Sequence, residues 1–426
     1  GLTAILTNRD IPFNRFGIYP VGKDQPVLCD GFARYRGDAL VALVGDRESI
    51  LSIGLDDLPI TFEVLDPIMS VGAAKAPSAL RLHEDNPDNL LIEGAVIKGD
   101  VARVASVVSE GQFKTRFVEH AYIEPEAGWA QMVDGRVEMH VTTQAVHMDR
   151  DEIASVLQVD KNQVRVIPTA CGGGFGGKTT VFIEPVALAL SRKAGRPVKI
   201  AMTRDEVFKA SGPTASSSMN VKIGVTKDGR ITAGYGEFRY QGGAFAGAPA
   251  DFGAMSAFAC YALDNVKTEA YDVVTNRPKG AAYRAPGAPM SVYAVESVID
   301  ELATRIGMDP IDLRLKNAAK EGSKSSYGPK FGSCGLVETL EAAKAHPHYS
   351  APLGPNQGRG VAGGFWFNFG GETCSNLNIN ADGTVTIAVG TPDIGGSRAS
   401  MCIMAAEELG IPYDKVCAIV ADTSAL

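Results

Sequence analysis

The most informative stretch of the sequence is Thr169-Ala-Cys-Gly-Gly-Gly-Phe-Gly-Gly-Lys-Thr179, where five glycines fill a window of six and only Phe175 interrupts them. Glycine has no Cβ and tolerates positive φ, so such a backbone can press its N–H groups directly against a bulky ligand or an anion. An ordinary strand-to-helix connection needs one or two glycines, not five around an aromatic ring. This glycine loop, residues 172–178, therefore predicts a cofactor site.

The same residues allow a second interpretation, because Gly172, Gly177, Lys178 and Thr179 satisfy the G-x-x-x-x-G-K-[ST] spacing of a phosphate-binding loop. A loop of that class leads straight into a helix whose N-terminal amides hold the phosphates. Pro185 follows six residues after Thr179, and it would break such a helix in its second turn at a cost of about 3 kcal/mol. A P-loop NTPase is therefore the disfavoured alternative.

Composition places the chain among ordinary globular proteins. Its 426 residues are 45% apolar and 21% charged, and the length suits roughly two to three domains of about 150 residues. The formal charge of −8, without a basic stripe, argues against a nucleic-acid partner. The longest apolar run, residues 252–263, is too short to cross a bilayer, which takes about 20 residues, so we expect no membrane span.

The cysteines are dispersed and show no C-x-x-C motif or close Cys/His grouping. Protein-ligated zinc or Fe–S sites are therefore not expected in this chain, and an odd, scattered set is typical of reduced thiols in the cytoplasm. The seven positions are 29, 171, 260, 334, 374, 402 and 417.

Periodicity and turn residues predict a chain of mixed helices and strands. Residues 38–44 are predicted as a buried strand, and Asp149 as the cap of a helix through Leu157. Residues 163–167 are predicted as a strand that leads into the glycine loop. Further helices are predicted over residues 185–194, 292–306, 310–316 and 400–409, and hairpins around residues 227–229 and 381–383. The chain begins with Gly1 and stops soon after an apolar run, so we expect a piece of a longer polypeptide.

A second small, rigid loop, Ala281-Ala-Tyr-Arg-Ala-Pro-Gly-Ala-Pro289, presents one fixed cation, Arg284, ahead of a helix. Together with the glycine loop and Thr142-Thr143-Gln144, this arginine loop resembles the large subunit of the molybdenum hydroxylases, the xanthine oxidase and aldehyde oxidase family. The resemblance covers essentially the whole chain. It is supported, in the same order, by residues 120–126, 195–199 and 308–317.

The resemblance implies an α+β fold with a small N-terminal domain ahead of cofactor-binding domains. The implied division is a partial α/β hammerhead-like domain at residues 1–65, a connector at 66–104, a first molybdenum-cofactor-binding domain at 105–321, a second connector at 322–359, and the start of a second molybdenum-cofactor-binding domain at 360–426.

It further implies a molybdenum ion held by the dithiolene of a molybdopterin, usually the cytosine dinucleotide form in bacteria, with no metal ligand from the protein. The family hydroxylates a C–H bond with water as oxygen source. Because this chain has no cysteine clusters, electrons would pass to [2Fe–2S] and FAD on partner subunits, in an oligomer of heterotrimers, or on the remainder of the same polypeptide.

Catalytic positions carry over residue by residue. Gln144 resembles the glutamine that donates to the oxo ligand, Phe175 lies among the backbone amides beside the metal, and Arg284 resembles the arginine next to the cofactor. The cofactor is expected to contact Gly173, Gly174, Phe175, Gly176, Arg284, Ala285, Gly395, Gly396 and Ser397.

The catalytic glutamate of the family lies beyond Leu426, so no base is named here. Glu124, Glu126 and Glu184 are available carboxylates, but we expect them to be structural or solvated groups.

The chain departs from the purine-oxidising pattern in its substrate pocket. Thr179 stands where those enzymes have a glutamate, Phe252 near their substrate-orienting arginine, and Pro286 at a stacking phenylalanine. We therefore expect an aldehyde or an aromatic N-heterocycle as substrate rather than xanthine. Gly396 replaces a cofactor-binding glutamine, which keeps open a non-catalytic scaffold derived from the family.

Overall fold

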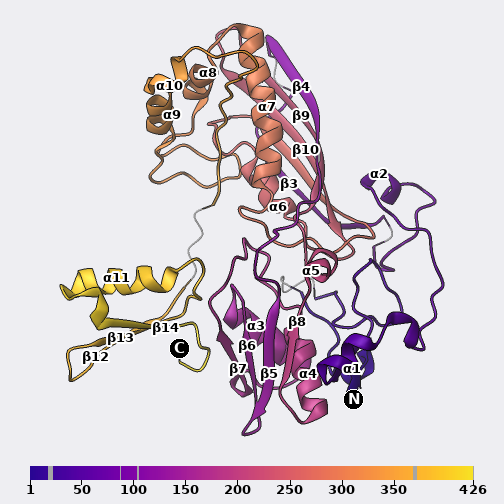
Figure 1. The fold of residues 1–426 in the computed structure, drawn as a ribbon. Coiled ribbons are helices and arrows are strands. Elements are labelled where there is room, and N and C mark those ends of the chain that lie inside the picture. The colour runs from indigo at the N-terminus through magenta and orange to yellow at the C-terminus, as the bar shows by residue number, and fades with distance from the viewer. Residues whose placement is uncertain (18–22, 87, 103–104, 368–371, 426) are drawn as a thin grey trace.

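The computed structural model describes residues 1–17, 23–86, 88–102, 105–367 and 372–425. Its α+β chain forms an upper body around a long sheet, a lower body around a shorter sheet, and a C-terminal body to one side (Figure 1). None of the described helices is long and apolar enough to cross a membrane.

The upper body is built on five strands in the order β3 (Leu90–Lys98), β11 (Val266–Val274), β10 (Ile231–Gly243), β9 (Ser216–Val225) and β4 (Val107–Thr115). All neighbours are antiparallel except β10 and β11. The long helix α7 (Ala288–Ile306) lies along one face of the sheet. Its Val295, Ile299 and Leu302 recur at helical spacing and are buried, so they anchor the core as the sequence predicts.

The lower body holds the glycine loop. Its sheet has the order β7 (Val164–Pro168), β6 (Arg136–Val141), β5 (Ala127–Val133) and β8 (Val198–Ala201). Helices α3 (Val146–Leu157) and α4 (Glu184–Ala194) share a core with this sheet. The N-terminal pair β1 (Leu2–Leu6) and β2 (Ala42–Gly45) packs against α4.

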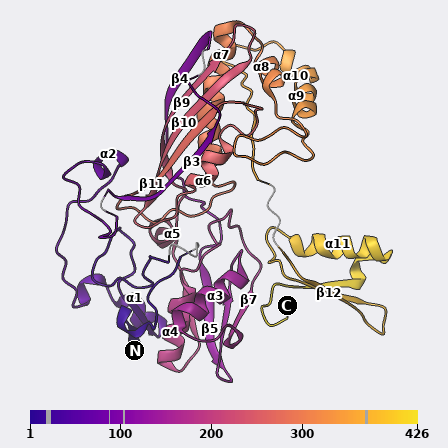
Figure 2. The same cartoon turned by 180° about the vertical axis from the view of Figure 1, so that it is seen from behind.

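The C-terminal body consists of β12 (Ser375–Ile379), β13 (Val385–Val389), β14 (Val416–Val420) and the helix α11 (Ser397–Leu409). It lies beside β7 in both views (Figure 2). There, Thr423 exchanges two hydrogen bonds with the Val166 backbone, of 2.9 and 3.2 Å, and Asp422 pairs with Arg165 at 2.6 Å. The edge of the lower sheet thus fixes where the C-terminal body sits.

The remaining elements are short. The helices are α1 (Arg47–Ser52), α2 (Val71–Ala74), α5 (Arg204–Ala210), α6 (Ala250–Ser256), α8 (Pro310–Asn317), α9 (Leu336–Ala345) and α10 (Pro347–Ser350). Single 3₁₀ turns span Asn8–Asp10, Leu55–Asp57, Lys161–Gln163 and Tyr413–Lys415.

Two local predictions are wrong. The strand expected at residues 38–44 covers only Ala42–Gly45 and is half-buried, because it belongs to a two-stranded ribbon. Asp149 does not cap α3. The helix begins at Val146 behind Ala145, whose side chain makes no cap, and the buried Val146 shows that packing decides the start. Asp149 instead lies buried within the first turns.

Both hairpins and the helices predicted after residue 185 are present, with ends shifted by a few residues. The segments expected as connectors contain regular structure. Residues 66–104 include β3, an edge strand of the long sheet, and residues 322–359 include α9 and α10. The division of the chain into five segments stays a prediction.

Candidate cofactor site

The glycine loop leaves the end of β7 and turns back on itself before α4 begins. The amide of Gly177 donates to the carbonyl of Gly174 at 2.8 Å. Phe175 has a φ of 56° and a side chain that is 48% exposed. Gly176 has a φ of 100°, and a Cβ there would lie 2.5 Å from the carbonyl oxygen of Ala282. Close approach of a second backbone therefore requires glycine at this position.

Gln144, which follows β6 by three residues, connects the glycine loop to the sheet of the lower body. Its side-chain Oε1 accepts from the backbone amides of Gly176 at 2.9 Å and Lys178 at 3.2 Å. The backbone amide of Gln144 donates to the Lys178 carbonyl at 2.8 Å. Within the described part of the chain, no hydrogen bond is recorded for Nε2. Anchoring one end of the side-chain amide therefore orients a donor that remains available for a ligand.

The arginine loop packs against the glycine loop. The amide of Arg284 donates to the carbonyl of Phe175 at 2.9 Å, and His120 Nε2 lies 2.6 Å from the carbonyl oxygen of Ala282. The side chain of Arg284 is exposed, and Ala285 has a φ of 60°. Left-handed conformations in non-glycine residues cost about 1–3 kcal/mol and cluster at ligand sites. Phe175 and Ala285 place two of them on facing loops.

The C-terminal body contributes a third loop, residues 393–397. The Cys171 amide donates to the carbonyl of Asp393 at 2.9 Å, and Cys171 pairs with Ile394 in a parallel bridge. Ser397 Oγ accepts from the Ile394 amide at 3.1 Å, which closes the turn before α11. The structure thus places residues 393–397 next to the start of the glycine loop, and both segments are expected to contact the cofactor.

Gly395 and Gly396 have φ values of 62° and 86°. A Cβ at Gly396 would meet no atom within 4 Å, but any side chain there would strain the backbone. The backbone conformation at position 396 thus favours glycine over the glutamine that the family usually has there.

The three residues expected in the substrate pocket divide into two places. The Thr179 hydroxyl donates to the Gly176 carbonyl at 2.7 Å, so it is turned onto its own loop. Phe252 lies in α6, next to Gly253, whose amide would be 2.6 Å from a Cβ at Gly287. This contact places Phe252 near Pro286, with ring centroids of Trp366 and Phe367 at 5.7 and 5.8 Å.

Lys178 rules out the phosphate-binding interpretation. Its side chain is 1% exposed and points beneath the loop, where Nζ donates to Glu124 Oε2 and Thr142 Oγ1, each at 3.0 Å. The residues after it are not helical until Glu184. A phosphate would find neither the lysine nor the helix N-terminus that such a loop provides.

Sequence reasoning missed a group of buried carboxyls under the loop. Glu126 and Glu184 are each 2% exposed, and Asp149 is 1% exposed, so none of the three is solvated. Burial, followed by the charge of Glu184, raises the pKa of Glu126 to about 8. Burial also raises the pKa of Glu184 and of Asp149. Only Glu126 and Glu184 have uncharged neighbours on both sides along the chain, and Asp149 is followed by Arg150, so little in the sequence signals this group.

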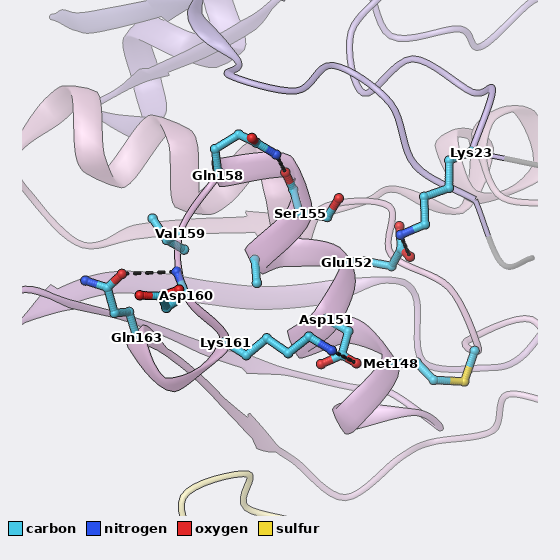
Figure 3. A pocket seen from close by; sticks show the side chains of 11 residues that line it. Lys23, Met148, Asp151, Glu152, Ser155, Gln158, Val159, Asp160, Lys161 and Gln163 are labelled. Atoms are coloured by element: carbon cyan, nitrogen blue, oxygen red, sulfur yellow. Dashed lines mark hydrogen bonds and ion pairs between the residues drawn. The ribbon is translucent and has the colours of Figure 1, made fainter. Parts of the chain in front are cut away.

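A hollow of about 760 Å³ lies elsewhere, beside α3 (Figure 3). Four of its five charged side chains are already paired, Lys23 with Glu152 and Lys161 with Asp151, both at 2.7 Å, and Asp160 is the fifth. It therefore offers a ligand little unpaired charge. In the part of the chain that the structure describes, no three His, Cys, Asp or Glu side chains are arranged to hold a metal ion.

Two family models match the sequence, and both are described as a molybdopterin cofactor-binding domain. They cover residues 82–318 and 340–426. The nicotinate dehydrogenase large molybdopterin subunit of Eubacterium barkeri is 33% identical over 353 residues, which cover 81% of this chain and 82% of that subunit. The xanthine dehydrogenase molybdenum-binding subunit of Escherichia coli O157:H7 is 31% identical over 454 residues, which cover 98% of this chain and 59% of that protein.

Solved structures give the same result. Aldehyde oxidoreductases from Desulfovibrio gigas and Desulfovibrio desulfuricans superpose with TM-scores of 0.87 and 0.89 at 25% and 26% identity. The match covers 100% of this chain and 50% of each of those chains. The chain thus spans about half the length of these structures and 59% of several curated relatives.

Proposed function

The chain belongs to the molybdopterin-binding large subunits of the molybdenum hydroxylases, and on that premise we propose that it holds the cofactor of an enzyme that hydroxylates an aldehyde or an aromatic N-heterocycle. One arrangement carries the proposal. Gln144 is held through Oε1 by the Gly176 and Lys178 amides, so its Nε2 is left to donate to a ligand, and the same two loops carry the exposed Phe175 and Arg284.

These residues fit the cofactor on their own geometry. Gln144 Nε2 supplies a fixed donor. Because Gly176 has no side chain, the glycine loop and the arginine loop can approach each other closely around one ligand. When bound, the molybdenum cofactor supplies two-electron oxidation with water as oxygen source. The chain's part is to bind and orient. Gln144 fixes one acceptor of the ligand, the Arg284 guanidinium offsets negative charge, and Gly395 to Ser397 hold the second side.

The substrate class is supported by the apolar setting of Phe252 and by one relative, the nicotinate dehydrogenase subunit, whereas other relatives are named xanthine dehydrogenase. Phe252 lies among aromatic rings, and the Thr179 hydroxyl donates its hydrogen bond to the Gly176 carbonyl. Neither position offers the charged anchor that a polar purine needs. Nicotinate is an aromatic N-heterocycle, and the relative that bears its name is 33% identical.

The finer features are part of the same proposal. We expect the cytosine dinucleotide form of the cofactor, [2Fe–2S] and FAD on partner subunits or on further polypeptide, an oligomer of heterotrimers and a cytoplasmic location. The catalytic base is expected outside residues 1–426. A non-catalytic scaffold is the second candidate, favoured only by Gly396.

Analysis of the purified full-length complex tests the proposal. Metal analysis should give one molybdenum per chain, and acid release should give a pterin with CMP. Absence of both overturns the proposed function. Cofactor retained without turnover on any aldehyde or N-heterocycle supports the scaffold instead.

A further inference from the structure

Lys178 is a buried lysine under the glycine loop, surrounded by several carboxyl groups. Its ammonium donates to Glu124 Oε2 at 3.0 Å, and the same carboxylate oxygen accepts from the Gly172 amide at 2.8 Å. Glu124 therefore links the Lys178 ammonium group to the backbone of Gly172, the first residue of the loop. At the other end of the loop, the Lys178 backbone is fastened to Gln144.

Two further carboxyls act on the same ammonium group. Glu126 and Glu184 both interact electrostatically with Lys178, and both are 2% exposed, whereas the Glu124 side chain is 32% exposed. Burial raises the pKa of Glu126 to about 8 and also raises the pKa of Glu184, although Glu126 accepts from the Tyr122 hydroxyl and Glu184 from the Phe182 amide. Glu124 is the carboxylate that hydrogen-bonds to the Lys178 ammonium.

The surrounding charged and titratable groups leave Lys178 as the central cation. Arg204 of α5 is bound to the carbonyls of Tyr122 and Ile123, at 2.6 and 2.8 Å. The other groups that face the cluster come from the segment before β5, from α3 and from the loop itself: Glu119, His120, Tyr122, Asp149, Glu152 and Cys171. The Tyr122 hydroxyl donates to Glu126 at 2.5 Å, and its ring lies 4.8 Å from Lys178 Nζ.

We propose that Lys178 is the positioning residue of the glycine loop, because its ammonium holds Glu124 against the Gly172 amide at one end of the loop while its backbone is bonded to Gln144 at the other. The inference rests on the proposed function only for what the loop faces. Loop order itself is a property of these side chains and can be measured without turnover.

Amide hydrogen exchange, followed by mass spectrometry on the full-length protein as purified, tests the positioning role. In Lys178→Met, peptides covering residues 169–180 should exchange about tenfold faster, because the Gly172 amide loses a charge-assisted acceptor held in place. Lys178→Arg should restore part of the protection. The control Lys161→Met removes an exposed lysine paired with Asp151 and should leave the loop unchanged. Equal exchange in Lys178→Met and the unmodified protein overturns the proposal.

If Lys178→Met fails to fold, Glu124→Gln takes its place, because that side chain is partly exposed. It should loosen the first half of the loop only, and an unchanged loop again overturns the proposal.

Molybdenum and pterin content, measured on the same samples, shows separately whether the proposed function holds.

Discussion

The amide of Arg284 donates to the carbonyl of Phe175 across 2.9 Å, so two loops far apart in sequence meet through their backbones. The bond leaves the exposed side chains of both residues available for a ligand. Because the contact is made by the backbone, side-chain substitutions at Arg284 can test function separately from fold.

Arg284→Ala should leave stability nearly unchanged and weaken the cofactor site. A surface substitution of this kind shifts the free energy of unfolding by about 0.5 kcal/mol or less. Loss of the guanidinium near an anionic cofactor should lower turnover about tenfold or more. Thermal unfolding, molybdenum content and turnover check this. Arg284→Lys keeps the charge but not the planar fork and should lie between the two. Full activity in Arg284→Ala contradicts the assigned role.

Gln144 can be tested with two variants that separate anchoring from donation. Gln144→Glu keeps an acceptor for the amides of Gly176 and Lys178 but has no N–H, whereas Gln144→Leu loses both functions. Removing one preorganised donor costs about 10²- to 10³-fold in kcat. We expect this loss in both variants, and additional destabilisation only in Gln144→Leu. Steady-state kinetics and unfolding curves measure the two effects. A normal kcat in Gln144→Glu contradicts a role for the Nε2 hydrogen bond in turnover.

The buried carboxyl of Glu126 predicts a pH dependence of stability. Its pKa is raised to about 8 by burial and by Glu184, against an ordinary value of 4.5. The folded state thus binds this proton more tightly than the unfolded state, so the free energy of unfolding falls as pH rises from about 4.5 to 8. At about 1.4 kcal/mol per pH unit, the loss is on the order of 5 kcal/mol.

Glu126→Gln should remove that part of the pH dependence and be more stable than the unmodified protein at alkaline pH. Denaturant unfolding at about pH 6 and pH 9 measures the difference. Parallel pH slopes for the two proteins mean that Glu126 is already ionised when folded.

Arg314 and Glu296 form a buried ion pair that holds the chain after α10. Arg314 Nε donates to Glu296 Oε2 at 2.8 Å, and the same oxygen accepts from the Gly363 amide at 2.6 Å. Removing one partner of a buried pair costs about 3–5 kcal/mol. Arg314→Met should therefore destabilise by that amount, and adding Glu296→Gln should recover part of it. Chemical denaturation of single and double variants checks the coupling, which additive losses would disprove.

Local signals predicted much of this fold. Pro185 and Gly195 bracket α4, and Asp228-Gly229 and Asp382-Gly383 mark hairpins, because backbone conformation at these residues depends on near neighbours. The family motifs also named the loops that meet at Cys171 and Arg284. Burial of Asp149, Glu126 and Glu184 was missed, since it depends on packing between residues distant in sequence. Lys178 was misleading for the same reason: its spacing fits a phosphate loop, but its partners lie on another segment.

The substrate pocket gives the most direct test of the proposed activity. Phe252, packed with Trp366 and Phe367, offers an apolar wall, and neither Phe252 nor Thr179 supplies a charged side chain to pair with the polar groups of xanthine. In a dye-reduction screen of the full complex, kcat/KM for aldehydes or aromatic N-heterocycles should exceed that for xanthine by about tenfold or more. Phe252→Leu should lower that preference while leaving molybdenum content unchanged. Xanthine as the best substrate would refute the interpretation of Thr179, Phe252 and Pro286 together.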